Sequence, residues 1–113
     1  MKQIQTQTKM RNQENDDVNT YAIAATRALK YGDVDHSRKI CNLGIQTYYS
    51  ELFRTNNDDN IGKKFQRRAD IYLKIADLYG IKGDKGLQEV CMRQSELASK
   101  DAMDLANAKR GTE

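Results

Sequence analysis

The chain has 113 residues, of which 38% are hydrophobic and 31% charged, and it contains neither proline nor tryptophan. This length fits a single domain with one modest core. No apolar run approaches the ~18 residues of a membrane span and no apolar leader follows Met1, so we expect a soluble cytoplasmic protein that binds no membrane. The 19 basic and 16 acidic residues give a net charge of +3 with both signs interspersed, which is not typical of a dedicated nucleic-acid binder.

The N-terminal stretch differs in composition from the rest of the chain. Its apolar side chains are Met1, Ile4 and Met10, and they do not recur at helical spacing. A segment that buries so little apolar surface does not offset the entropy lost when it becomes ordered. We therefore predict a mobile polar arm at residues 1–16 and a single helical domain at residues 17–110.

Two helices are predicted in the first half of this domain, at about residues 17–54. Apolar residues recur every three or four positions from Val18 to Leu29, and Gly32 is a natural stop. The first helix can be capped by Asn15, Asp16 or Asp17, and the second by Asp33 or Asp35. The apolar stripe of the second helix consists of Cys41, Ile45, Tyr48, Tyr49, Leu52 and Phe53.

Two more helices are predicted at about residues 61–108, after a break. The break is the run TNNDDN at 55–60, because Asn and Asp favour turns. The third helix begins near Ile61 and ends at Gly83, and the fourth begins near Asp84 and frays near Lys109. Its expected inward residues are Leu87, Val90, Cys91, Leu97, Ala98, Ala102, Leu105 and Ala106. No segment alternates as a half-buried strand does, so the predicted fold class is all-α with four helices.

The two halves share an internal repeat. A shift of 51 positions pairs Tyr21 with Tyr72, Ala25 with Ala76, Gly32 with Gly83, and Asp33 with Asp84. A small alanine lets a neighbouring helix approach closely, and a Gly-Asp pair ends one helix and caps the next. The pattern resembles the tetratricopeptide repeat, a helix–turn–helix unit of about 34 residues. The resemblance implies a four-helix array of two antiparallel hairpins.

The resemblance also implies a binding surface. In that family ligands lie along a groove lined by the first helix of each hairpin. The matching positions in this chain are Asn19, Ala22, Thr26, Leu29, Lys30, Asp70, Leu73 and Asp77. Ala22 and Leu73 stand where the carboxylate-clamp version of the family has lysine, so we do not expect recognition of a C-terminal carboxylate. The mixed apolar and acidic lining better suits a partner helix or a basic peptide. Two repeats are fewer than the three that normally stabilise such a stack, so we expect extra burial from the long second helix or from self-association into a homo-oligomer.

Residues that carry chemistry are scarce. His36 is the only histidine, and Cys41 and Cys91 lack the spacing of a zinc or redox motif. We expect both cysteines to be buried and reduced. The glycines around Gly83 lack the Gly-Lys-Ser/Thr ending of a P-loop. We therefore predict no catalytic, metal-binding or cofactor-binding residue, and no enzyme.

The strongest surface feature is a basic run on the third helix. It consists of Lys63, Lys64, Arg67, Arg68 and Lys74. A solvated helix face is the favoured interpretation, ahead of a patch that binds an anion or a partner. The leading functional hypothesis is a small non-enzymatic protein–protein interaction module, an adaptor or regulator. A helical nucleic-acid-associated protein is the alternative, and a small enzyme is third.

Overall fold

The computed structural model describes the backbone of residues 18–112 and the side chains of residues 18–109. The arm predicted at residues 1–16 lies outside the described residues. The helices are α2 (Thr20–Lys30), α3 (Val34–Arg54), α4 (Ile61–Lys82) and α5 (Lys85–Thr112), with one 3₁₀ turn, η1 (Thr55–Asn57), after α3. The prediction of an all-α chain with four helices is confirmed for this part of the chain. None of these helices combines the length and the apolar character needed to cross a bilayer.

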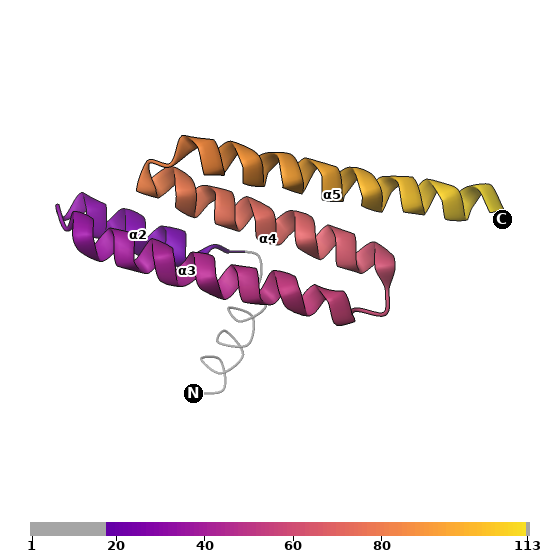
Figure 1. The fold of residues 1–113 in the computed structure, drawn as a ribbon, viewed down its shortest axis with the longest axis horizontal. Coiled ribbons are helices and arrows are strands. Elements are labelled where there is room, and N and C mark those ends of the chain that lie inside the picture. Colours follow the sequence, from indigo (N-terminus) through magenta and orange to yellow (C-terminus); the bar gives the residue numbers. More distant parts are fainter. Residues whose placement is uncertain (1–17, 113) are drawn as a thin grey trace, which may run out of the picture.

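Consecutive helices run antiparallel to one another (Figure 1). The long helix α4 lies between α3 and α5, and the shorter α2 contacts both α3 and α4. Helix α5 packs along α4 and has no comparable contact with α2 or α3. One face of α5 is therefore covered by a single neighbour, and the rest of its surface stays open.

Polar and glycine residues set the helix ends. Gly32 and Gly83 adopt left-handed backbone angles (φ +81° and +86°), which glycine tolerates without strain, and they end α2 and α4 as predicted. The Oδ1 atom of Asp33 then accepts a bond from the amide of the third residue of α3, and Asp84 does the same in α5. The start of the first helix differs from the prediction, because α2 is capped by Asn19 and not by Asn15, Asp16 or Asp17. Helix α5 also continues to Thr112, past the predicted fraying point.

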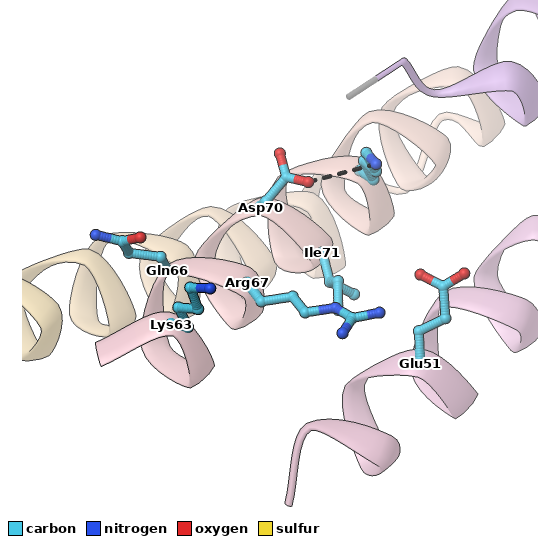
Figure 2. Close-up of a pocket in the computed structure, with 7 residues that line it drawn as sticks. Glu51, Lys63, Gln66, Arg67, Asp70 and Ile71 are labelled. Carbon is cyan, nitrogen blue, oxygen red and sulfur yellow. Dashed lines mark ion pairs between the residues drawn. The ribbon is translucent and has the colours of Figure 1, made fainter. Parts of the chain in front are cut away.

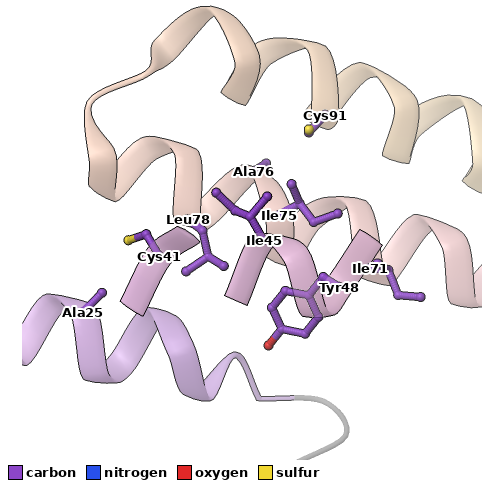
Figure 3. Close-up of a cluster of buried hydrophobic side chains, with 9 residues drawn as sticks. All are labelled: Ala25, Cys41, Ile45, Tyr48, Ile71, Ile75, Ala76, Leu78 and Cys91. Atoms are coloured by element: carbon purple, nitrogen blue, oxygen red, sulfur yellow. The ribbon is translucent and has the colours of Figure 1, made fainter. Parts of the chain in front are cut away.

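The core gathers where α2, α3 and α4 meet and extends to α5 (Figure 3). Its buried members are Ala25, Cys41, Ile45, Tyr48, Ile71, Ile75, Ala76, Leu78 and Cys91. Close approach at the centre requires Gly44. A methyl group at Gly44 would lie 2.7 Å from the Tyr21 Cβ and from the Leu78 Cδ1, so α2 and α4 pack directly on the backbone of α3. Both cysteines are buried and unbonded to each other, in line with their positions on apolar stripes.

Burial of α5 differs from the prediction. Cys91, Ala98 and Ala102 are buried and Leu105 is partly buried, but the other predicted inward residues are exposed. These exposed residues are Leu87 (43%), Val90 (50%), Leu97 (50%) and Ala106. The reason is that α4 is the principal neighbour of α5 among the described elements, so a narrow stripe suffices. Ser95 lies within that stripe, and its buried hydroxyl donates to the Ala69 carbonyl at 2.7 Å.

Two aromatic positions of α3 are also corrected. Tyr49 and Phe53, both expected on the inward stripe, expose 40% and 76% of their surface. Phe53 lies in the last turn of α3, beyond the core cluster, and Tyr49 lies at the edge of that cluster with its hydroxyl near the Cys91 Sγ.

Candidate functional site

The candidate site lies where α2 stops covering the junction of α3 and α4. Helix α2 has 11 residues, whereas α3 and α4 have 21 and 22. At 1.5 Å per residue, α2 spans ~16 Å against ~32 Å for its neighbours, so about half of the junction lies beyond it. Two cavities open there, and they share Glu51 and Lys74.

The larger of these, called here the main cavity, has a volume of about 600 Å³. Its lining residues are Glu51, Lys63, Gln66, Arg67, Asp70, Ile71 and Lys74. The smaller cavity, of about 160 Å³, lies at the N-terminal end of α2. It is lined by Val18, Thr20, Tyr21, Thr47, Tyr48, Glu51 and Lys74.

Three cations of α4 line the main cavity. Lys63, Arg67 and Lys74 are spaced four and seven residues apart, so they share one face of the helix. Lys74 exposes only 8% of its surface. Its Nζ lies 3.3 Å from the Asp70 Oδ2 and 5.7 Å from the centre of the Tyr48 ring. A paired carboxylate and an aromatic face therefore stabilise the buried ammonium.

The other two cations are differently placed. Figure 2 shows Arg67 extending from α4 toward Glu51 on α3, while the dashed line marks the pair between Asp70 and Lys74. Neither Lys63 nor Arg67 forms an ion pair with another described residue. The lining thus has three cations against two carboxylates, and two of the cations have donors that no ion pair with another described residue uses.

Asn19 fixes the wall of the smaller cavity. Its Nδ2 donates to the Lys74 carbonyl at 2.9 Å, and its Oδ1 accepts bonds from the Tyr48 hydroxyl at 3.0 Å and the Ala22 amide at 3.1 Å. The Tyr48 ring meets the Tyr21 ring edge-on, with 5.6 Å between centroids. One amide side chain therefore joins the start of α2 to both α3 and α4.

Burial also perturbs the phenol of Tyr48. It raises the pKa of the Tyr48 phenol to about 12, and the nearby Glu51 carboxylate adds to the effect. The hydroxyl therefore stays protonated at a pH near 10, where an ordinary tyrosine ionises, and can still donate to Asn19 there.

The groove residues expected from the repeat do not form one surface: some are engaged in contacts within the fold or line the main cavity, and the others are exposed. Asn19 is engaged in capping and bridging, Ala22 is half-buried against the core, and Asp70 belongs to the main cavity. Leu73 exposes 48% of its surface and Leu29 39%. The remaining three, Thr26, Lys30 and Asp77, are exposed, and partial desolvation raises the pKa of the Asp77 carboxyl.

The five residues of the basic run also fall into two groups, one inside the main cavity and one outside it. Lys63, Arg67 and Lys74 line the main cavity. Lys64 and Arg68 follow Lys63 and Arg67 by one residue, which is a rotation of roughly 100° around the helix, and both are half-buried.

The nucleophilic side chains lie elsewhere. The Tyr49 hydroxyl is 3.9 Å from the Cys91 Sγ, and burial raises the pKa of the Cys91 thiol. Burial likewise raises the pKa of Cys41. His36 is exposed in the first turn of α3. Among the described residues no group of three or more His, Cys, Asp or Glu side chains is placed to hold a metal ion.

Sequence reasoning missed three residues of the main cavity: Glu51, Gln66 and Ile71. Gln66 and Ile71 could have been placed from helical spacing alone, because they lie on the same turns as Lys63, Arg67 and Asp70. Glu51 gave no such signal, because it comes from α3 and reaches the cavity only through the packing of α3 on α4.

Comparison with known proteins adds no relative. No family model, no curated protein and no solved structure matches this chain. The fold and the cavity define an all-α chain with a mixed-charge site between two long helices.

Proposed function

We propose that this chain is a small non-enzymatic protein–protein interaction module, an adaptor or regulator that binds a helical segment of a partner. The proposed surface is the outward side of α2 and α4, the two helices that the sequence repeat equates. The observation that carries the proposal has two parts. The side chain of Asn19, the N-cap of α2, bonds to the Lys74 carbonyl of α4 and so joins the two helices. Leu73, on α4, leaves 48% of its surface exposed. An exposed leucine on a fixed two-helix surface is the kind of anchor that a partner helix buries.

The neighbour order of the helices supports the tetratricopeptide-like interpretation. Helix α2 packs on α3 and also on α4, the first helix of the next predicted hairpin, and α4 packs on α5. A first helix that contacts both its own partner and the next first helix is what stacked hairpins require. This order supports a two-hairpin unit whose first helices form a shared surface.

The states of the nucleophiles support a non-enzymatic role. Burial raises the pKa of both thiols, and a protonated thiol is a weak nucleophile. The chain's only histidine is exposed in the first helical turn of α3, whereas the two cysteines are buried.

A comparative capture experiment tests the proposal. Tagged wild-type protein and Leu73→Glu are each incubated with extract from the native host, and bound proteins and nucleic acids are identified. Leu43→Glu is the matched control, because Leu43 exposes 57% of its surface on α3 and receives the same charge. We expect a protein that wild type and Leu43→Glu retain and that Leu73→Glu loses. Equal capture by all three would contradict the proposed surface.

A nucleic-acid-associated role is the second candidate. The observation in its favour is that Lys63 and Arg67 form no ion pair with a described residue. Capture that is abolished by nuclease and falls steeply with salt would favour this alternative, because neutralised phosphates release counterions on binding.

A further inference from the structure

We propose that the main cavity between α3 and α4 binds an acidic helical peptide segment, with its carboxylates on Lys63 and Arg67. This inference rests on the proposed function, since the ligand is part of a partner protein, and it adds the chemistry of a second contact. Three features of the cavity lead to it: its shape, the spacing of its cations and the position of its carboxylates.

The shape suits a helix. Helix α2 already occupies one half of the α3–α4 junction, and the main cavity continues along the other half. The length of the junction that no other described helix covers is ~15 Å, or about three helical turns, judged from the difference in helix lengths. A partner helix of this length would continue the packing of α2 end to end. Ile71 lies in the lining and offers an apolar contact.

The spacing of the two cations indicates how far apart the acidic side chains of the partner peptide should be. Lys63 and Arg67 are one helical turn apart on α4, so their Cα atoms are about 6 Å apart along the axis. Two acidic side chains three or four residues apart on a partner helix have the same spacing. Lys74 lies about two turns further along the same face of α4, and its pair with Asp70 makes it the fixed end of the site.

The carboxylates of the cavity favour a peptide over phosphate. Glu51 points toward Arg67 from α3 (Figure 2), and Asp70 is paired with Lys74. A phosphate group concentrates its negative charge on one compact group, which cannot contact Arg67 and also keep clear of the Glu51 carboxylate. A peptide can instead place a basic or amide side chain opposite Glu51 and its acids opposite Lys63 and Arg67.

Binding of synthetic peptides to the full-length protein tests this directly. The probe is a fluorescein-labelled, end-capped 14-residue Ala/Gln-based helix with Glu at positions i and i+4 and one Leu between them. A matched peptide has Gln at both Glu positions. Inorganic phosphate and a 12-nucleotide single strand are tested as competitors. Fluorescence anisotropy gives the affinities, and amide chemical shifts locate the bound peptide.

We expect the Glu peptide to bind more tightly than the Gln peptide and to shift the amides of Glu51, Ile71 and Lys74. Arg67→Gln should weaken the Glu peptide by about three- to fivefold, the effect of one partly exposed charge pair. Lys64→Gln is the control that removes one charge from outside the main cavity, and it should leave the affinity unchanged. Thermal melts by circular dichroism check that both variants remain folded.

Several outcomes would overturn the inference. The first is equal binding of the Glu and Gln peptides. The second is an equal loss of affinity for the Glu peptide in Arg67→Gln and Lys64→Gln. The third is binding of phosphate or the oligonucleotide to this cavity while the Glu peptide does not bind. The proposed function fails separately, if Leu73→Glu captures the same proteins as wild type. The two failures are therefore distinguishable.

Discussion

Gly44 offers a sharp test of how the helices pack. Replacing it by alanine adds one methyl group at the point where α3 meets both α2 and α4. That methyl would lie 2.7 Å from the Tyr21 Cβ and from the Leu78 Cδ1. The Tyr21 Cβ is fixed to the backbone of α2, so the helix itself must shift.

The expected magnitude follows from two opposing effects. Overpacking a fitted core position destabilises by roughly 1–3 kcal/mol. Removing a glycine from a helix interior stabilises by about 1 kcal/mol. Gly86→Ala in α5 is the control without a clash, because the nearest atom to its new methyl is the Asp84 Oδ1 at 4.0 Å. Gly86 lies in the first turn of α5, where the gain in helix propensity is smaller than at an interior position, so Gly44→Ala should be less stable than Gly86→Ala by up to about 3 kcal/mol.

Urea unfolding followed by circular dichroism at 222 nm measures this difference. The free energies of unfolding of wild type, Gly44→Ala and Gly86→Ala are compared by linear extrapolation, with equal slopes confirming a common two-state transition. If Gly44→Ala is as stable as Gly86→Ala, α2 and α4 do not pack directly on the backbone of α3 and the packing described above is wrong.

Three further predictions concern the core. Ala76→Arg should destabilise the protein by about 3 kcal/mol or more, because Ala76 is 2% exposed and a long charged side chain there is both overpacked and unpaired; an unchanged melting temperature would refute this. Cys41 and Cys91 should react slowly with a thiol reagent in native buffer, because burial raises the pKa of both, and should give two equivalents after denaturation without reductant; rapid native labelling would contradict it. Because the folded-state pKa of Tyr48 is raised from 10 to about 12, its protonated form contributes stability below pH 10 that is lost as the pH rises toward 12; urea unfolding of wild type and Tyr48→Phe at pH 9 and pH 11 should show a smaller loss in the variant.

The helix ends were predictable because they are encoded locally. Gly32-Asp33 and Gly83-Asp84 each combine a residue that tolerates positive φ with one that caps the following helix, so four residues fix two turns without any tertiary information. The residue that caps the start of α2 was harder to predict. Several Asn and Asp residues follow one another before it, and Asn19 was selected because it also bonds to the Lys74 carbonyl across the fold.

The packing of α5 could not be read from periodicity. Leu87, Val90 and Leu97 repeat at helical spacing, but the spacing does not say how many neighbours a helix has. With α4 as its principal neighbour, α5 buries a stripe that includes Ser95 and leaves these three exposed. An isolated glycine within a helical pattern often marks close packing, so Gly44 was a signal that sequence reasoning passed over.

The candidate site was predictable only in part. The spacing of Lys63, Arg67 and Lys74 puts three cations on one face of α4, and that much follows from the sequence. The burial of Lys74 against Tyr48 does not, because Tyr48 lies 26 positions away on another helix. Whether a basic helix face is solvated or lines a cavity depends on the helix packed beside it.

The measurement that tests the central claim most directly is the dissociation rate of the captured partner from immobilised protein by surface plasmon resonance. Leu73→Asp removes an apolar anchor, so it should raise the dissociation rate by about tenfold or more, the effect of losing a desolvated contact. The double variant Lys63→Glu/Arg67→Glu should mainly slow association and weaken its dependence on salt. If the charge reversals abolish binding while Leu73→Asp dissociates like wild type, the two-helix surface is not the binding site and the basic face takes its place.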